Sequence, residues 1–559
     1  MAHGRPDGVR PAEGVRPAAG VRLAELVAAL SLATDLGLGQ PREHVLRQTL
    51  IAQRLAASAG WAEHQRAVFY VSQLAWVGCI SDSHELAKWF GDDLLLRSDS
   101  YQVDMAGPPM ARFLLSHIGS GAPPLRRLTT IGRFLASGVG DTAHSFLTHC
   151  QTTGDIAERL GLGVDVRQAL AQAFERWDGK GAPARLAGER IDPVMRLVHI
   201  ADDAEVEHRI AGARGALGML LARRGTAFDP ALVDMCHRHA DVIFAGLDDE
   251  DAWSSALRGV VELEQPLDEA ELTRALRVFA DYADLKSPSR LGHSRGVAEL
   301  AAGAARRLGL PQDQVTLVER AGLVHDIGII GVSSAVWDRE GPLSGSAWER
   351  VRTHPYLTER VLSRHPRLAE IGAVAGLHHE RLDGSGYPRG VGGEAIPVTA
   401  RLVAAADVYH ALGEDRPHRP AVGAERAARV LREDVRSGRL DGESVNAVLA
   451  AAGHRVRRRP ALPAGLTPRE VEVLVLLARG ASNKAIARRL SVSARTIGSH
   501  VEHVYTKIGV SSRGAAAVFA LRHGLASGIN TDRTGDDPAG ADPTEGEPTG
   551  GETWDRNIG

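Results

Sequence analysis

Apolar residues recur at helical spacing along much of the chain. Leu23, Leu26, Val27 and Leu30 open one such run, and the same period returns from residue 272 to residue 278. Positions three and four residues apart lie on one face of a helix, so these runs predict amphipathic helices that pack through one side. The pattern therefore predicts an all-α protein.

A shorter periodic segment, residues 465–527, predicts a small domain of three helices. Thr467 and Glu470 form the pattern of a capping box, and Pro468 suits the first helical position. Gly480 is expected to end this helix. A second helix is expected over 482–490, and a third from Ala494 to Ile508. This order of elements predicts a helix-turn-helix, whose later helix enters the major groove of DNA.

Stretches without apolar period divide the chain into parts. We expect a disordered N-terminal arm (1–22), a helical domain (23–245), an acidic connector (246–271), a second helical domain (272–453), a basic linker (454–464), the small helical domain (465–527) and a disordered acidic tail (528–559).

Composition narrows the cellular setting. The chain has 559 residues and a formal net charge of −3, so it is too long for a single core, and only local patches can indicate charged partners. Its three cysteines, Cys79, Cys150 and Cys236, are scattered, which is typical of a reducing compartment. No apolar run approaches the roughly 20 residues of a membrane span. We therefore expect a cytoplasmic protein without a membrane contact.

Histidines and aspartates gather in the second helical domain in an unusual pattern. The candidate metal ligands are His293, His325, Asp326, His354, His378, His379 and Asp407. Imidazole and carboxylate suit divalent iron, manganese or a similar ion, and seven ligands exceed one tetrahedral site. The set therefore predicts two divalent metal ions that share one carboxylate. Such a pair can clamp a phosphoryl group and activate water.

These motifs resemble those of the HD-GYP phosphohydrolases, a branch of the HD superfamily. The resemblance covers about 280–435 and rests on Gly292-His293, His325-Asp326-Ile327-Gly328, Thr353-His354-Pro355, the run from His378 to Pro388, and Ala406-Asp407. It implies an all-helical domain that hydrolyses cyclic di-GMP. It also implies that His293, His325, Asp326 and Asp407 hold one metal and that Asp326, His354, His378 and His379 hold the other. His325, Asp326, Arg381 and Tyr387 are the implied catalytic residues, and Gly384, Gly386, Tyr387 and Arg381 the implied substrate contacts.

One position departs from the family pattern. The family usually has a lysine after the His-Asp-Ile-Gly motif, where this chain has Ile329. Arg381 is the nearest cation that can take over a phosphate contact. Two alternatives therefore stay open beside a cyclic di-GMP phosphodiesterase. One is a transcription factor that binds a nucleotide without turnover, and the other is an HD hydrolase of another phosphoester.

The first helical domain looks like a degenerate copy of the second. Residues 175–183 mirror 380–388, and residues 196–202 mirror 401–407 at the same offset, which argues for duplication. His44, His149 and Asp202 remain, but Trp76-Val77 is expected where His325-Asp326 stands, and Ala173-Phe174 replaces His378-His379. We therefore expect a regulatory or dimerising domain without catalysis. His84 is expected on a helix face.

The small domain resembles the LuxR-type DNA-binding domain along its whole length, through residues such as 466–470, Asn483-Lys484, Val492-Ser493 and Lys507. The resemblance implies promoter binding, and by analogy a homodimer on paired half-sites. The expected DNA contacts are Lys484, Arg495, Thr496, Ser499, His500, Lys507 and Arg513. Gly498 and Glu502 stand where basic residues are frequent. A purely protein-binding helical trio is the alternative.

Overall fold

A computed structural model describes residues 20–120, 123–249, 251–258, 260, 264–455, 463–490, 492–523 and 525. These residues form helices joined by turns, and within them only isolated bridges, no strands, are present. The predicted all-α class is confirmed. The described residues up to 454 form one compact unit, and those from 455 onward form another.

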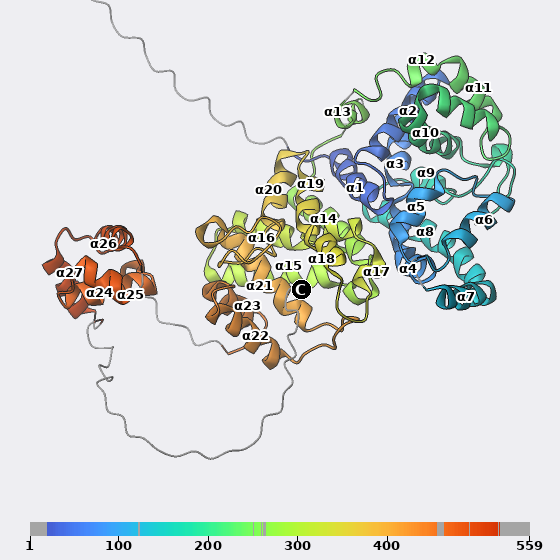
Figure 1. Cartoon of the computed structure of the whole chain (residues 1–559). Coiled ribbons are helices and arrows are strands. Elements are labelled where there is room, and N and C mark those ends of the chain that lie inside the picture. Colours follow the sequence, from blue (N-terminus) through green and yellow to red (C-terminus); the bar gives the residue numbers. More distant parts are fainter. Residues whose placement is uncertain are drawn as a thin grey trace, which may run out of the picture. The chain divides into compact units, whose positions relative to one another are not determined.

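The first copy runs from residue 20 to residue 260 (Figure 1). Its helices are α1 (Leu23–Gly37), α2 (His44–Ser58), α3 (Gln65–Leu74), α4 (Ser83–Phe90), α5 (Asp93–Ser100), α6 (Gly107–His117), α7 (Pro124–Arg133), α8 (Val139–Arg159), α9 (Val164–Leu170), α10 (Pro193–Ala222), α11 (Pro230–Arg238), α12 (Ala240–Ile243) and α13 (Ala252–Leu257). Shorter turns of helix are η1 (Ala62–His64), η2 (Val77–Asp82), η3 (Phe134–Gly138) and η4 (Gly188–Arg190).

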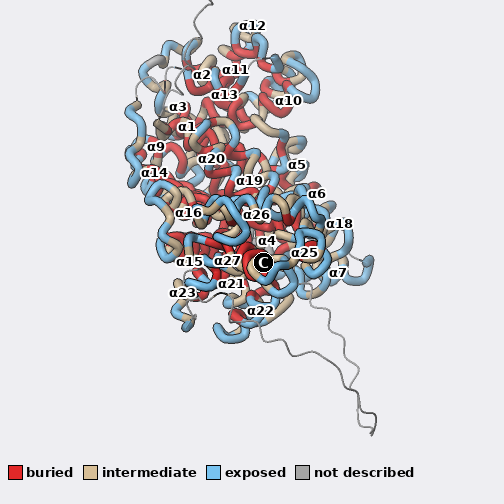
Figure 2. Tube along the Cα trace, turned by 90° about the vertical axis from the view of Figure 1, so that its left-hand side faces the viewer, coloured by how far each residue is buried: buried red, intermediate tan, exposed pale blue. Residues whose placement is uncertain are grey.

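The second copy follows from residue 264. Its helices are α14 (Glu269–Asp284), α15 (His293–Leu308), α16 (Gln312–Val324), α17 (Ser334–Trp337), α18 (Gly345–Arg352), α19 (His354–Leu362), α20 (Pro366–Ala375), α21 (Val398–Leu412), α22 (Ala424–Arg436) and α23 (Gly442–Ala451), with the turns η6 (Pro288–Arg290), η7 (Ile327–Gly331) and η8 (Gly393–Ala395). Helix α15 packs on α16, α21 and α23, just as α2 packs on α3 and α10 in the first copy. Buried residues form the interior of both copies (Figure 2).

Two glycines fix the correspondence between the copies. A β-carbon on Gly78 would lie 2.3 Å from the carbonyl oxygen of His149, and one on Gly328 would lie 2.0 Å from that of His354. The offset between copies is thus 250 residues at the glycines and 205 at the histidines, so the first copy is longer by 45 residues in between. The first copy has α4 to α7 in this stretch, where the second copy has α17 (Ser334–Trp337) and α18 (Gly345–Arg352). The role of Gly328 is thus a close approach to the backbone at His354.

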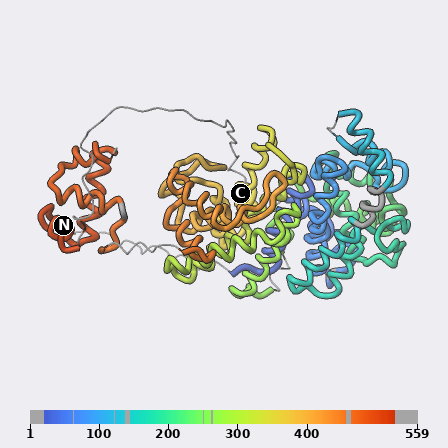
Figure 3. The backbone as a smooth tube through the Cα atoms, turned by 90° about the horizontal axis from the view of Figure 1, so that it is seen from below, coloured from blue at the N-terminus to red at the C-terminus, as the bar shows by residue number. Residues whose placement is uncertain are grey.

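The two copies pack against each other, as Figure 3 shows for the blue α1 and the yellow and green helices of the second copy. Helix α1 contacts η7 and α19, and the Thr34 and Tyr282 hydroxyls lie 3.3 Å apart between α1 and α14. The fully buried Lys286 donates from Nζ to Asp93 Oδ2 at 2.6 Å. The first copy is therefore part of the body that supports the second.

The acidic connector is more structured than predicted. Residues 252–257 form α13, which packs on α2 with Trp253, Ala256 and Leu257 buried, so this part of 246–271 is not a solvated connector. Glu264 accepts a hydrogen bond from the backbone N–H of Ala24 at 3.0 Å. The sequence did not predict α13, because its few apolar residues lie between acidic residues.

The N-terminal arm is shorter than the predicted range 1–22. Residues 20–22 belong to the folded body, because Val21 is buried and its carbonyl accepts from the N–H of Leu267 in the second copy at 2.8 Å. Residues 1–19, the tail 528–559 and most of the linker 454–464 lie outside the described residues.

The small domain contains η9 (Pro463–Gly465), α24 (Pro468–Ala478), α25 (Asn483–Leu490), α26 (Ala494–Ile508) and α27 (Arg513–Arg522). The capping box of Thr467 and Glu470 is present, and Gly509 ends α26 at a φ of 68°. These features confirm the three predicted helices. Helix α27 was not predicted, although Ala516 and Ala520 from it complete the core. None of the described helices of the chain combines the length and apolar character that a membrane span requires.

Candidate metal centre

Five segments of the second copy bring the seven predicted ligands into one buried cluster. His293 opens α15 after Gly292, whose φ of 85° is a left-handed conformation that favours glycine. His325 and Asp326 join α16 to η7, and His354 opens α19. His378 and His379 follow α20, and Asp407 lies within α21. Each of the seven is at most 3% exposed.

Asp326 lies at the centre of this cluster, with one oxygen toward each group of imidazoles. Its Oδ1 lies 3.4 Å from His354 Nε2 and 3.6 Å from His378 Nε2. Its Oδ2 lies 3.5 Å from His325 Nε2 and 3.8 Å from His293 Nε2. This arrangement is what a carboxylate needs to bridge two ions.

Asp407 completes one group and His379 the other. Asp407 Oδ1 lies 3.2 Å from His293 Nε2 and 3.8 Å from His325 Nε2. His293, His325 and Asp407 form one set whose donor atoms lie within 4.8 Å of one another, and His354, His378 and His379 form another.

Hydrogen bonds to the backbone orient three of the imidazoles. The Nδ1–H groups of His325, His354 and His378 donate to the carbonyls of Gly322, Val351 and Ala375 at 2.7, 2.6 and 2.7 Å. Because Nδ1 carries the proton in each ring, Nε2 is left as a free base that faces Asp326. Such partners are the usual means of fixing the tautomer of a metal-binding histidine.

The electrostatics of the cluster favour the protonation states of metal ligands at His325, His379 and Asp326, but they favour the protonated form of His293. Burial lowers the pKa of His325 to about 4. Burial also lowers the pKa of His379, and neighbouring imidazoles lower it further. Burial opposes ionisation of Asp326, but His325 and Arg290 hold its pKa well below the usual range. For His293 burial is outweighed by hydrogen bonds to Asp407 and Glu414, which raise the pKa to about 9.

Several polar residues beside the cluster were not predicted. Arg290 Nη1 donates to Asp326 Oδ2 through a short contact, is 3% exposed and lies over the Trp337 ring at 4.6 Å. Glu414 Oε2 accepts from His293 Nδ1 at 3.0 Å, and Arg416 Nη2 donates to the same oxygen at 2.6 Å. Arg290 stands only three residues before His293, which was the one available signal. Glu414 follows the end of α21, so helical periodicity could not predict which way its side chain points.

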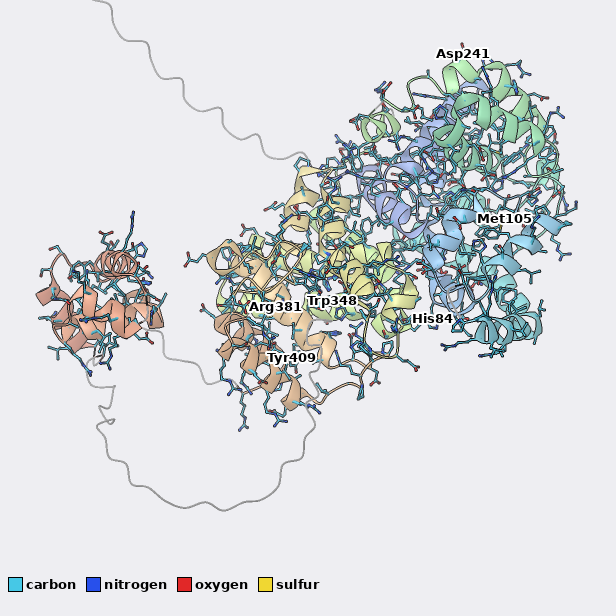
Figure 4. All side chains as sticks on the ribbon, viewed as in Figure 1. His84, Met105, Asp241, Trp348, Arg381 and Tyr409 are labelled. Carbon is cyan, nitrogen blue, oxygen red and sulfur yellow. The ribbon has the colours of Figure 1, made fainter. Side chains whose placement is uncertain are left out.

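The predicted substrate contacts have clear places in the second copy. Tyr387 is 5% exposed and stacks on His379 with ring centroids 4.6 Å apart. Arg381, labelled in Figure 4, donates from Nη1 to the carbonyls of His378 and Glu380 at 3.0 Å each. Arg381 therefore supports the histidine-bearing turn, and its contact with a phosphate stays a prediction.

The glycines of the loop have structural roles. Gly384 has a φ of 78°, which requires little strain only for glycine. A β-carbon on Gly386 would lie within 2.5 Å of backbone atoms of residues 379–381, so the loop packs directly against the histidine turn. Their contact with substrate stays a prediction.

Ile329 is fully buried and belongs to an apolar cluster with Val332, Trp337 and Val351. The Trp337 Nε1–H donates to the carbonyl of Ile329 at 3.2 Å. The Ile329 side chain is thus part of this apolar cluster.

In the first copy aromatic rings fill the corresponding place. The glycine correspondence aligns Ala75-Trp76 with His325-Asp326, which corrects the predicted register by one residue. Phe174 replaces His379, and its ring lies 6.0 Å from Trp76 and 4.6 Å from His149. The groups that could hold a metal among the described residues all belong to the second copy.

Of the retained residues of the first copy, His44 and Asp202 contact each other, whereas His149 Nε2 lies 2.8 Å from the carbonyl oxygen of Ala75. His44 Nε2 lies 3.1 Å from Asp202 Oδ1, and His44 Nδ1 lies 2.5 Å from Glu205 Oε2. His84 instead contacts the second copy, because its Nδ1 lies 2.7 Å from Asp338 Oδ2.

The predicted DNA contacts lie mainly on the outside of the small domain. Lys484, Arg495, Thr496, Ser499, Lys507 and Arg513 are exposed, and His500 is half-buried. Lys507 Nζ lies 2.8 Å from Glu470 Oε2, and Arg513 donates to the carbonyl of Ala481. The last two side chains thus already contact their own domain.

Comparison with known proteins identifies both parts of the chain. The HD domain family matches residues 142–232 and 277–444, and the family described as bacterial regulatory proteins, luxR family, matches residues 464–520. The 3'3'-cGAMP-specific phosphodiesterase 3 of Vibrio cholerae serotype O1 is 30% identical over 435 residues, which cover 76% of this chain and 94% of that protein.

A solved structure and a second relative agree with this result. The crystal structure of a cyclic GMP-AMP specific phosphodiesterase of V. cholerae superimposes with a TM-score of 0.55 at 26% identity, covering 78% of this chain and 99% of that one. The cyclic di-GMP phosphodiesterase response regulator RpfG of Xanthomonas campestris pv. campestris is 38% identical over 154 residues, which cover 27% of this chain and 39% of that protein. The chain therefore belongs to the HD-GYP branch of the HD domain family, as a tandem pair with a degenerate first copy, and carries a C-terminal domain of the luxR family.

Proposed function

We propose that the second copy is a metal-dependent phosphodiesterase for a cyclic dinucleotide, and that the small domain couples it to promoter DNA in the cytoplasm. The observation that carries the proposal is the convergence of five histidines and two aspartates around Asp326, with each Asp326 oxygen between 3.4 and 3.8 Å from two imidazole nitrogens.

Buried polar atoms of the cluster support two divalent ions, iron, manganese or similar. His325 Nε2, His379 Nδ1 and Asp407 Oδ2 are buried and have no hydrogen-bond partner among the described residues. Such atoms cost free energy unless an ion or another group satisfies them. We assign His293, His325, Asp326 and Asp407 to one ion, and Asp326, His354, His378 and His379 to the other.

The residues around the ions define the reaction that the site can support. Two bound ions would supply an activated water and neutralise charge on a phosphodiester. Asp326 would be a ligand of both ions, and Tyr387 stacks beside His379. Arg290 places a guanidinium next to Asp326, where it can meet a phosphate oxygen. We assign catalytic roles to His325 and Asp326 and substrate contacts to Arg381, Tyr387, Gly384 and Gly386.

The relatives support a cyclic dinucleotide as the substrate class. The V. cholerae relative that matches both copies is described as specific for 3'3'-cGAMP, whereas RpfG is described as a cyclic di-GMP phosphodiesterase. Cyclic di-GMP was the substrate expected from the sequence, and 3'3'-cGAMP is now an equally direct candidate. Both carry two phosphodiesters that a dicationic site can bind.

The helix-turn-helix supports the regulatory half of the proposal. Exposed Arg495, Thr496 and Ser499 line one face of α26, the helix that would enter the major groove. We infer a homodimer on paired half-sites, with Lys484 and Arg495 among the phosphate contacts.

A nucleotide sensor without turnover is the second candidate. Buried Ile329 favours it, because this position offers the substrate no cation. In that protein the pocket would bind a nucleotide and alter DNA binding only. An HD hydrolase of another phosphoester is the remaining alternative.

One experiment separates these functions. Full-length protein is analysed for metal content and for turnover of cyclic di-GMP and 3'3'-cGAMP. Asp407→Ala should abolish turnover, whereas Asp202→Ala, its counterpart in the first copy, should not. Metal and nucleotide binding without turnover would refute the phosphodiesterase in favour of the sensor. Turnover of another phosphoester alone would favour the third candidate.

A further inference from the structure

His293 differs from its neighbouring ligands in how its second ring nitrogen is held. The other three oriented imidazoles donate from Nδ1 to backbone carbonyls, but His293 Nδ1 lies 3.0 Å from Glu414 Oε2. The other Glu414 oxygen, Oε1, lies 3.2 Å from His410 Nδ1. Arg416 Nη2 donates to Glu414 Oε2, the same oxygen that faces His293, at 2.6 Å. A carboxylate thus orients this ring and makes it more basic.

The first copy holds the equivalent histidine with an acid from a different position. His44 Nδ1 lies 2.5 Å from Glu205 Oε2, and Arg209 Nε lies 3.6 Å from Glu205 Oε1. At the offset of 205 residues, Glu205 corresponds to position 410 and Arg209 to position 414. The acid and the basic residue have therefore exchanged places between the copies, while the contact with the histidine is kept.

A glycine makes this exchange possible. A β-carbon on Gly296 would lie 1.8 Å from His410 Nε2, so the imidazole at 410 requires a residue without a side chain at 296. The first copy has Arg47 at the equivalent position, three residues after its histidine, and no imidazole to accommodate. Gly296, His410 and Glu414 thus form one linked adaptation.

We infer that Glu414 is a positioning residue for the metal ligand His293, and that Gly296 and His410 place Glu414 in this role. The inference rests on the proposed metal-dependent function. Glu414 accepts the Nδ1–H of His293 and directs Nε2 toward Asp407 and Asp326. Carboxylates in this position are worth roughly 10- to 100-fold in metal affinity in other metalloproteins. Nothing in the role requires Glu414 to touch the ion or the substrate.

The test measures Mn²⁺ affinity of metal-stripped full-length protein by titration calorimetry. Glu414→Gln should weaken binding roughly 10- to 100-fold, while the exposed Glu394→Gln should leave it unchanged. The decisive variant is His410→Glu/Glu414→Gln, which returns the acid to the position used by the first copy. It should recover most of the lost affinity, which a merely structural role of Glu414 would not allow.

Other outcomes would contradict the inference or the proposed function. Unchanged affinity in Glu414→Gln, or a folded double variant as weak as the single one, would overturn the inference. If Glu414→Gln lowers the melting temperature strongly, Gly296→Ala takes its place. Its methyl group must displace His410, so affinity should fall, and unchanged affinity would count against the inference. Wild-type protein that binds no Mn²⁺ would instead overturn the proposed function, and this role with it.

Discussion

Replacing Asp93 by leucine is expected to loosen the second copy, although Asp93 belongs to the first. Asp93 Oδ2 accepts from Lys286 Nζ at 2.6 Å, and Oδ1 accepts from Ser333 Oγ at 2.8 Å and from the Ser334 N–H at 2.9 Å. Lys286 precedes the turn that carries Arg290, and residues 333–334 open the helix that carries Trp337. A single carboxylate therefore ties both segments to the first copy.

The magnitude follows from burial. The side chains of Asp93 and Lys286 are both 0% exposed, so Asp93→Leu leaves an ammonium group buried without its carboxylate. Breaking one partner of such a pair costs about 3–5 kcal/mol, whereas replacing both partners by apolar residues is often neutral. Asp93→Leu should therefore be strongly destabilising, and Asp93→Leu/Lys286→Met should recover the part of the stability that is lost through the unpaired ammonium group, while Ser333 and Ser334 still lack their acceptor.

The assay is urea unfolding of full-length protein, followed by tryptophan fluorescence. Glu319→Gln provides a matched control, because it breaks the exposed pair of Glu319 with Arg277, which should cost less than about 1 kcal/mol. A loss below about 1 kcal/mol in Asp93→Leu would refute the reasoning. So would a double variant less stable than the single one.

Three further predictions concern other parts of the chain. Asp326→Ala should remove both ions, because it deletes the shared carboxylate, and elemental analysis should find less than one ion per chain. In the first copy, burial opposes charge on His44, but Glu205 and Asp202 raise its pKa to about 10, above the ordinary value of 6.5. The stability that His44 contributes is therefore fully present below about pH 6.5 and is lost as the pH rises through 10. In thermal melts, the gap between wild type and His44→Gln should narrow over that range, and a constant gap would refute this. Arg495→Ala should weaken DNA binding and reduce the salt dependence by about one phosphate contact, in fluorescence anisotropy at several salt concentrations.

Much of the fold could be read from the sequence because local signals and global packing agree. The capping box at Thr467 and Glu470 predicted the start of α24, and the apolar period predicted α1 and α14. The cluster around Asp326 was predicted from residue types alone, since seven such side chains at those spacings have few other uses. A motif of this kind therefore predicts a site before its geometry is known.

What escaped prediction depends on contacts between distant segments. Glu414 lies beyond the end of α21, so only the three-dimensional turn of the chain brings it to His293. The position of Arg290 depends on a contact with the ring of Trp337, which belongs to a separate helix. The register of Trp76 was missed by one residue, because the close approach of Gly78 to the His149 carbonyl, which fixes the register, exists only in the folded chain.

The glycine-rich loop beside the histidine turn has a consequence for how ions enter. A β-carbon on Gly386 would lie within 2.5 Å of backbone atoms of residues 379–381, and one on Gly181 of the first copy would meet residues 174–176 in the same way, although no ligand pair exists there. The conformation of the loop is therefore set by backbone packing and does not depend on bound cations. Ligands held by backbone packing select ions by size and coordination preference. Discrimination among divalent ions would then be set when the chain folds, before any nucleotide arrives.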